Sequence, residues 1–121
     1  MADEIRIPAA QLGDGERHTV ELDGRRVTVF NVDGRVVAYH DRCAHQGGPV
    51  CTRGTLHPYL TADVGEDGEA REYFKEGATT IACPWHGWEY DLATGVSLAD
   101  PRRRLRRARV ARDGDELVIG L

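Results

Sequence analysis

Two short stretches each hold one cysteine and one histidine, and they constrain the fold more than any other feature of the chain. The first stretch, CAHQGGP, spans residues 43–49, and the second, CPWHGW, spans residues 83–88. Two cysteines and two histidines are enough to hold a metal centre. We therefore expect a fold that brings these two distant loops to one site.

The rest of the sequence predicts an all-β fold of many short strands, a sandwich or partly open barrel. Asp-Gly pairs at residues 23–24, 33–34 and 113–114 are typical of tight hairpin turns. The flanking β-prone runs predict strands over residues 18–22, 25–32, 35–40, 89–92, 95–99, 108–112 and 116–121. Short helical turns are expected within residues 7–12 and around 69–75, and residues 52–80 are expected to form a long polar connection.

Composition and charge limit the function classes. A net charge of −4 does not indicate nucleic-acid binding, and no apolar run approaches the ~20 residues of a membrane span. The N-terminus has acids where a secretory signal has basic residues, so a cytoplasmic protein is expected. Three cysteines, an odd number, favour thiolate or metal chemistry over a disulfide framework.

Charge is unevenly distributed along the chain. Residues 61–76 carry six acids against two basic residues, and residues 101–112 carry seven arginines and no acid. Each run is interpreted first as a solvated face. The alternative is a docking surface for a charged partner.

Zinc and iron are both candidates for the metal. Structural zinc sites usually begin with two cysteines two to four residues apart and group their histidines, whereas here each stretch is mixed. A two-iron cluster, with two cysteines on one iron and two histidines on the other, matches the mixed pattern better.

The two stretches resemble the Rieske [2Fe–2S] domain, in particular the small soluble ferredoxins of bacterial aromatic-ring dioxygenase systems. The resemblance extends through VVAYHDRCAHQGGP, CPWHGWEYDLATG and RVARDGDELVIGL. It implies a β-sandwich base at about residues 1–40 and 100–121. A small cluster-binding subdomain is inserted at about 41–99, with a long polar insertion at about 52–80, all within one domain.

The resemblance also implies roles for individual residues around one [2Fe–2S] cluster. Cys43 and Cys83 would bind one iron, and His45 and His86 the other. The residues expected to lie around the cluster are Gly47, Gly48 and Gly87, which let backbone amides approach its sulfurs, Trp88, and Pro101 in a covering loop.

Departures from the family pattern carry information as well. The respiratory-chain type has a disulfide whose positions match Gly48 and Trp85, and a serine at the position of Trp88. Without these features we expect a reduction potential at the low end of the family range, about −150 mV. Cys51 does not align with the disulfide cysteine and is interpreted as a free, buried thiol.

The resemblance implies an electron carrier and not an enzyme. No second iron site and no Gly-rich dinucleotide motif are found, which favours a monomeric shuttle that binds a reductase and an oxygenase transiently. One alternative is the small subunit of a larger reductase, such as assimilatory nitrite reductase. A zinc-stabilised interaction module remains the third.

Overall fold

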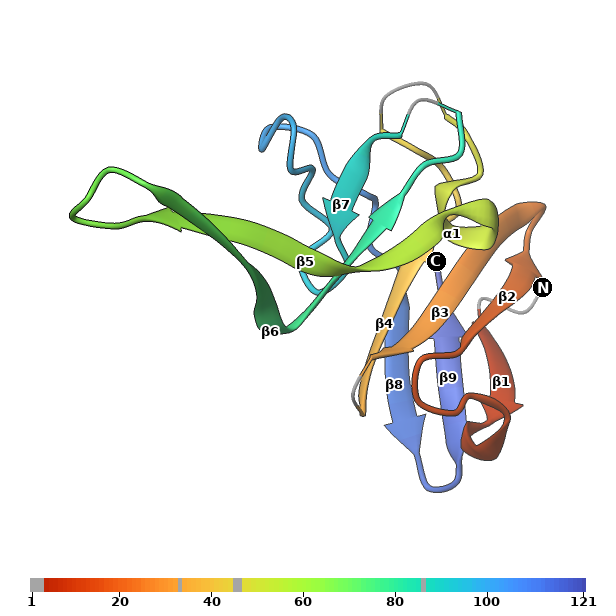
Figure 1. The fold of residues 1–121 in the computed structure, drawn as a ribbon. Helices are drawn as coiled ribbons and strands as arrows, with labels where there is room; N and C mark the ends of the chain where they lie inside the picture. Colours follow the sequence, from red (N-terminus) through yellow and green to blue (C-terminus); the bar gives the residue numbers. More distant parts are fainter. Residues whose placement is uncertain (1–3, 33, 45–46, 86) are drawn as a thin grey trace.

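A computed structural model describes residues 4–32, 34–44, 47–85 and 87–121. The described chain forms three antiparallel three-stranded sheets, in the orders β1-β9-β8, β2-β3-β4 and β5-β6-β7 (Figure 1). The strands are β1 (Glu4–Pro8), β2 (Arg17–Leu22), β3 (Arg25–Val32), β4 (Arg35–His40), β5 (Thr55–Val64), β6 (Ala70–Ala82), β7 (Glu89–Asp91), β8 (Arg109–Asp113) and β9 (Glu116–Gly120). A 3₁₀ turn, η1 (Ala9–Gln11), and one short helix, α1 (Val50–Arg53), complete the elements. The expected all-β class is confirmed.

The first two sheets follow from the hairpin signals in the sequence. Strands β2, β3 and β4 form a meander, and β8 pairs with β9. Asp23 and Gly24 both have positive φ (49° and 72°), as a two-residue type I′ turn requires. Strand β1, which the sequence did not predict, pairs with β9. The helical turn expected within residues 7–12 is present as η1.

The β2-β3-β4 sheet packs against a hydrophobic cluster on each face. Successive side chains of a strand point to opposite faces, so neighbouring residues enter different clusters. Val29 and Ala38 belong to one hydrophobic cluster, whereas their chain neighbours Phe30 and Tyr39 belong to another. The first cluster packs against the β1-β9-β8 sheet: Ile7, Leu12, Val20, Leu22, Val27, Val29, Ala38, Ala108, Leu117 and Ile119. The second joins the middle sheet to the segments around both Cys/His stretches: Phe30, Tyr39, Cys43, Val50, Cys51, Ile81, Cys83, Tyr90, Leu92 and Leu105.

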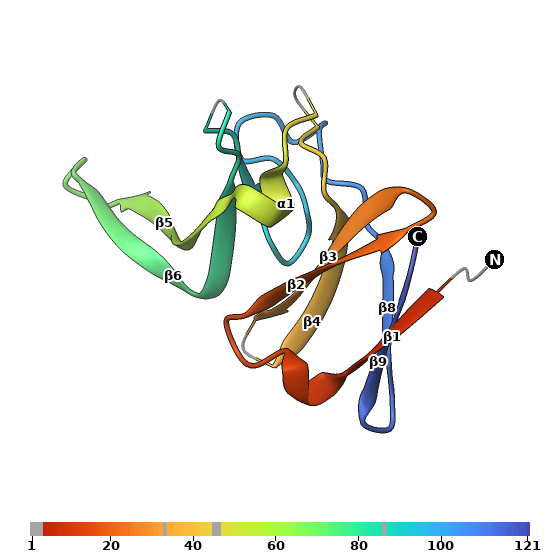
Figure 2. The ribbon, with the colours of Figure 1, turned by 90° about the vertical axis from the view of Figure 1, so that its right-hand side faces the viewer.

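Residues 52–80 differ from the expected polar connection. They contribute most of a long hairpin, in which β5 pairs with β6 from Thr55↔Ala82 to Val64↔Ala70, with an irregularity between Pro58 and Leu60. Figures 1 and 2 show this hairpin extending away from the other two sheets. The helical turn expected around 69–75 was therefore wrong, because inter-strand pairing satisfies the backbone of that segment.

The strand expected over residues 95–99 is also reduced. Among the described residues, this segment forms the isolated bridges Tyr90↔Ser97 and Val96↔Arg104 instead of a regular strand. The Ser97 hydroxyl accepts the backbone N–H groups of Ala99 and Asp100. These hydrogen bonds bend the chain into a turn, so residues 95–99 do not continue as a regular strand beside β7.

Candidate metal centre

The two Cys/His loops share one backbone construction. In the first loop, the N–H of Cys43 donates to Gly48 O (2.8 Å) and the N–H of Gly47 donates to Cys43 O (2.8 Å). In the second, the N–H of Cys83 donates to Trp88 O (2.8 Å) and the N–H of Gly87 donates to Cys83 O (2.9 Å). Each cysteine therefore begins a closed loop with the same two hydrogen bonds.

Glycine is required at the fourth position after each cysteine. Gly47 has φ +75° and Gly87 has φ +71°, a region that side chains with a Cβ rarely adopt. That these glycines let backbone amides approach the cluster sulfurs stays a prediction. Cys43 follows β4 and Cys83 follows β6, so both loops are anchored on sheets.

The loops lie against each other at one end of the molecule, opposite the β8–β9 turn (Figure 2). A Cβ at position 48 would lie 2.9 Å from Trp85 Cδ2 and 3.1 Å from Cys83 Sγ, so only glycine fits there. Gly48 and Trp85 stand at the two positions that carry a disulfide in the respiratory-chain type. Here the indole of Trp85 packs over Gly48 instead. Trp85 remains 57% exposed, so the site lies at the surface.

Tyr90 is fully buried in the second hydrophobic cluster and also contacts the first loop directly. Its hydroxyl lies 3.0 Å from Cys43 Sγ and accepts the backbone N–H of Ala44 (3.1 Å). Because that bond leaves the hydroxyl proton available, a Cys43 thiolate would accept it. Tyr90 lies in β7, where it pairs with Ile81 of β6. The sequence around Tyr90 contains no local signal for a contact with Cys43.

Trp88 and Pro101 differ in how the fold places them. Trp88 packs at the edge of the second hydrophobic cluster, with the Arg103 guanidinium 5.7 Å from its ring centre. Arg103 also donates to the carbonyl of Ala44 (3.1 Å), which ties its segment to the first loop. Pro101 lies in an exposed turn closed by the N–H of Arg103 on Asp100 O (2.9 Å). These contacts place Arg103 against the first Cys/His loop. The sequence analysis did not predict a role for Arg103.

Cys51 is separate from the candidate ligands. It is fully buried in α1, and its Sγ donates to His40 O at 3.6 Å. Burial raises the pKa of the Cys51 thiol, so it stays protonated. All three cysteines are free, which confirms the interpretation of Cys51 as a buried free thiol.

The donor set agrees with a metal centre as far as the structure describes it. Cys43 and Cys83 are 4% and 3% exposed, without a disulfide, in adjoining loops of matching construction. His45 and His86 lie outside the described residues. No group of three or more ligating side chains occurs within the described part of the chain, which excludes both histidines. Nor do those residues include a helix long and apolar enough to cross a membrane.

Comparisons with known proteins point to one family. The family model of the Rieske [2Fe–2S] domain matches residues 5–109. A human Rieske domain-containing protein is 34% identical over 83 residues, which cover 69% of this chain and only 42% of that protein.

Two solved structures share the fold. The ferredoxin of carbazole 1,9a-dioxygenase from Nocardioides aromaticivorans IC177 is 23% identical, covers 98% of each chain and has a TM-score of 0.67. A candidate NADH-dependent nitrite reductase small subunit from Mycobacterium tuberculosis is 20% identical, covers 98% of this chain and 96% of that one, and has a TM-score of 0.68.

Proposed function

Because the chain belongs to the Rieske [2Fe–2S] domain family, we propose that it carries single electrons from a reductase to an oxygenase. The observation that supports this most is the pair of matched loops, which present two buried, unbridged cysteines at one exposed end of the molecule. An electron carrier needs its redox group near the surface so that a partner can approach it. The cofactor of the family is one [2Fe–2S] cluster, which replaces the zinc alternative.

When bound, such a cluster supplies one-electron chemistry. In this proposal Cys43 and Cys83 hold one iron, and His45 and His86 hold the other. Gly47, Gly48 and Gly87 keep the backbone close, with no side chain between it and the cluster. The Tyr90 hydroxyl donates to Cys43 Sγ, and Trp88 covers one side of the site.

The carrier is proposed to be monomeric and cytoplasmic, with no catalytic site of its own. Its reductase and oxygenase partners would bind in turn at the loop end. The ferredoxin of carbazole 1,9a-dioxygenase, whose fold the chain shares, supports an oxygenase partner by its name.

Electron paramagnetic resonance of the dithionite-reduced protein, with a redox titration of the same sample, tests the cluster. A rhombic signal typical of a reduced Rieske centre is expected, and a Cys43→Ser variant should lose most of it. Mixing with the reductase and oxygenase encoded beside the gene then tests the transfer. A cluster that is reducible but passes no electrons between any such pair contradicts the shuttle role.

The second candidate is the small subunit of a larger reductase. The fold likeness to a nitrite reductase small subunit and the long projecting β5–β6 hairpin, which offers a surface for a permanent interface, favour it. Size-exclusion chromatography of native extract separates the two functions. A shuttle elutes alone, whereas a subunit elutes with its large partner.

A further inference from the structure

An arginine-lined pocket of about 700 Å³ lies directly beside the first Cys/His loop. Three separate segments form it: the start of β3, the end of β4 with the loop that follows, and the segment before β8. The lining residues that the argument uses are Arg25, Arg26, His40, Arg42, Arg104 and Arg106. Cys43, Ala44 and Gly47 line the same pocket, so an occupant would touch the loop that carries the candidate ligand.

The positive charge of this pocket is not neutralised from within the described structure. None of its five arginines forms an ion pair with a carboxylate among the described residues. Asp41 is the only acid in the lining, and its carboxylate accepts the N–H groups of Cys51 and Thr52 and the Thr52 hydroxyl. The pocket therefore presents five guanidinium groups against one carboxylate next to the site.

His40 adds an independent observation. Its side chain is 7% exposed, and Nε2 has no hydrogen-bond partner within the described residues. Buried polar atoms are almost always paired, so an unpaired one in a pocket wall marks a position for an external polar group. Burial, with Arg106 and Arg25 nearby, lowers the pKa of His40, which favours the neutral imidazole.

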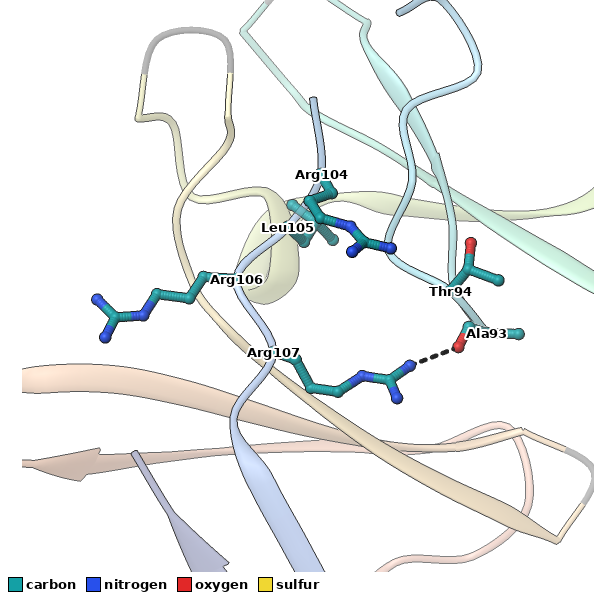
Figure 3. Close-up of a pocket in the computed structure, with 6 residues that line it drawn as sticks. All are labelled: Ala93, Thr94, Arg104, Leu105, Arg106 and Arg107. Carbon is teal, nitrogen blue, oxygen red and sulfur yellow. Dashed lines mark hydrogen bonds between the residues drawn. The ribbon is translucent and has the colours of Figure 1, made fainter. Parts of the chain in front are cut away.

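The neighbouring arginines behave differently. Figure 3 shows a second pocket, which Arg104 and Arg106 also line. In it Arg107 donates to the carbonyl of Ala93 (2.8 Å), while the Arg106 side chain extends from the other side of the chain. Arg107 also lies over the Tyr39 ring, 5.8 Å from its centre. Arg107 is thus held by the fold, whereas Arg106 lines the pocket beside the first loop.

We propose that the pocket lined by Arg25, Arg26, His40, Arg42, Arg104 and Arg106 docks an acidic segment of the electron-transfer partner. The inference rests on the proposed function, because a partner that approaches the Cys43 loop must cover this pocket. Five cations spread over three segments fit several carboxylates on one peptide better than a single small anion. Charge complementarity of this kind accelerates association and fixes the orientation of the partner.

A fluorescently labelled hexaglutamate peptide, titrated into the holoprotein and followed by anisotropy, tests the pocket. The Arg25→Gln/Arg106→Gln variant should bind the peptide about five- to tenfold more weakly, as expected for the loss of two ion pairs. The matched control, Arg35→Gln/Arg112→Gln, removes the same charge from exposed arginines outside the pocket and should change affinity less than about twofold. Equal weakening in both variants overturns the proposal, because it shows general attraction only.

Two further measurements complete the test. Bound peptide should slow the oxidation of the reduced protein by ferricyanide, because it covers the Cys43 loop; an unchanged rate overturns the placement beside that loop. Displacement of the peptide by inorganic phosphate at equal ionic strength and equal concentration overturns the acidic-segment assignment in favour of a small oxyanion. The visible spectrum of each sample reports the cluster separately, so a failed cofactor assignment is not confused with a failed docking site.

Discussion

The Tyr90 hydroxyl lies 3.0 Å from Sγ of Cys43, a candidate ligand. A donated hydrogen bond stabilises the sulfur more when the centre gains an electron, so it raises the reduction potential. This donor offsets part of the low potential expected from the missing serine and disulfide. Tyr90→Phe should lower the potential by about 40–60 mV, equivalent to about 1–1.4 kcal/mol for one electron. Spectroelectrochemical titration measures it.

Tyr39→Phe is the control for that experiment. Tyr39 is equally buried, but its hydroxyl donates to the carbonyl of Leu92 (2.7 Å). This variant should lose about 1 kcal/mol of unfolding free energy with its potential unchanged. Equal shifts of potential in both variants would contradict the role of Tyr90.

Cys51 predicts a different behaviour with pH. Burial raises the pKa of its thiol, so in the folded protein it should resist alkylation by iodoacetamide at pH 9, where an ordinary thiol reacts. Below about pH 8.5, the pKa of an ordinary cysteine in the unfolded chain, the Cys51 thiol is neutral in both states and costs no stability. As pH rises above this value, the unfolded thiol ionises while the folded one stays protonated, so the free energy of unfolding falls. Above pH 9 the unfolding free energy should fall by up to about 1.4 kcal/mol per pH unit. Mass spectrometry measures the iodoacetamide labelling of Cys51 in the folded protein and in protein unfolded by guanidinium. Equal labelling in the two samples contradicts the prediction.

Residue-level features can be read from the sequence where the determinant is local. Gly47 and Gly87, both with positive φ, each follow their cysteine by four positions, so sequence spacing alone marks them. Tyr90 and Arg103 reach the first loop from far along the chain. Only the tertiary fold reveals such contacts.

At the scale of elements, the β5–β6 hairpin was the largest departure from expectation. Its sequence lacks the alternation of apolar and polar residues by which a strand is recognised, so the extended ladder was not predicted. The turn signals were Gly65 and Gly68: the N–H of Gly65 donates to Glu69 O, and Gly68 has φ +79°. The meander β2–β4 was predicted well, since its strands are apolar on the buried face and the sequence has an Asp-Gly pair between each two of them.

Shortening this hairpin tests whether it serves the site. Pro58 and Thr79 are paired partners, so residues 59–78 can be replaced by Asn-Gly. The visible and electron paramagnetic resonance spectra should be unchanged, and the unfolding free energy should change by less than about 1 kcal/mol. Loss of colour would show that the outer hairpin protects the cluster.

The junction of α1 with β5 depends on Gly54. A Cβ there would meet Val50 O and lie 2.7 Å from Ile81 Cγ1 and 2.8 Å from Ala82 O. Gly54→Ala should cost about 2–3 kcal/mol in urea unfolding, because neither backbone carbonyl can move freely. The control Gly68→Ala has open space around it and should cost about 1 kcal/mol from its positive φ alone. Similar costs for both variants would contradict the packing argument.

At the scale of the whole molecule, the core consists of two hydrophobic clusters that support different parts of the fold. One lies between the β1-β9-β8 and β2-β3-β4 sheets, and the other supports the Cys/His loops. We propose that the division into a base (about residues 1–40 and 100–121) and a cluster-binding part (about 41–99) governs the response to metal removal. In apoprotein, the amides of Gly47 and Gly87 should exchange hydrogen at least tenfold faster, whereas those of Val27 and Val29 should keep their protection. Uniform loss of protection would contradict two separable parts.

Both tryptophans of the chain, Trp85 and Trp88, lie in the second Cys/His loop. One packs over Gly48 with more than half of its surface open to solvent, and the other lies under the Arg103 guanidinium. Ultraviolet-excited indole emission from this protein therefore comes from the metal-binding end alone. A change in its wavelength or lifetime would report the arrival of a redox partner in real time, without any attached dye.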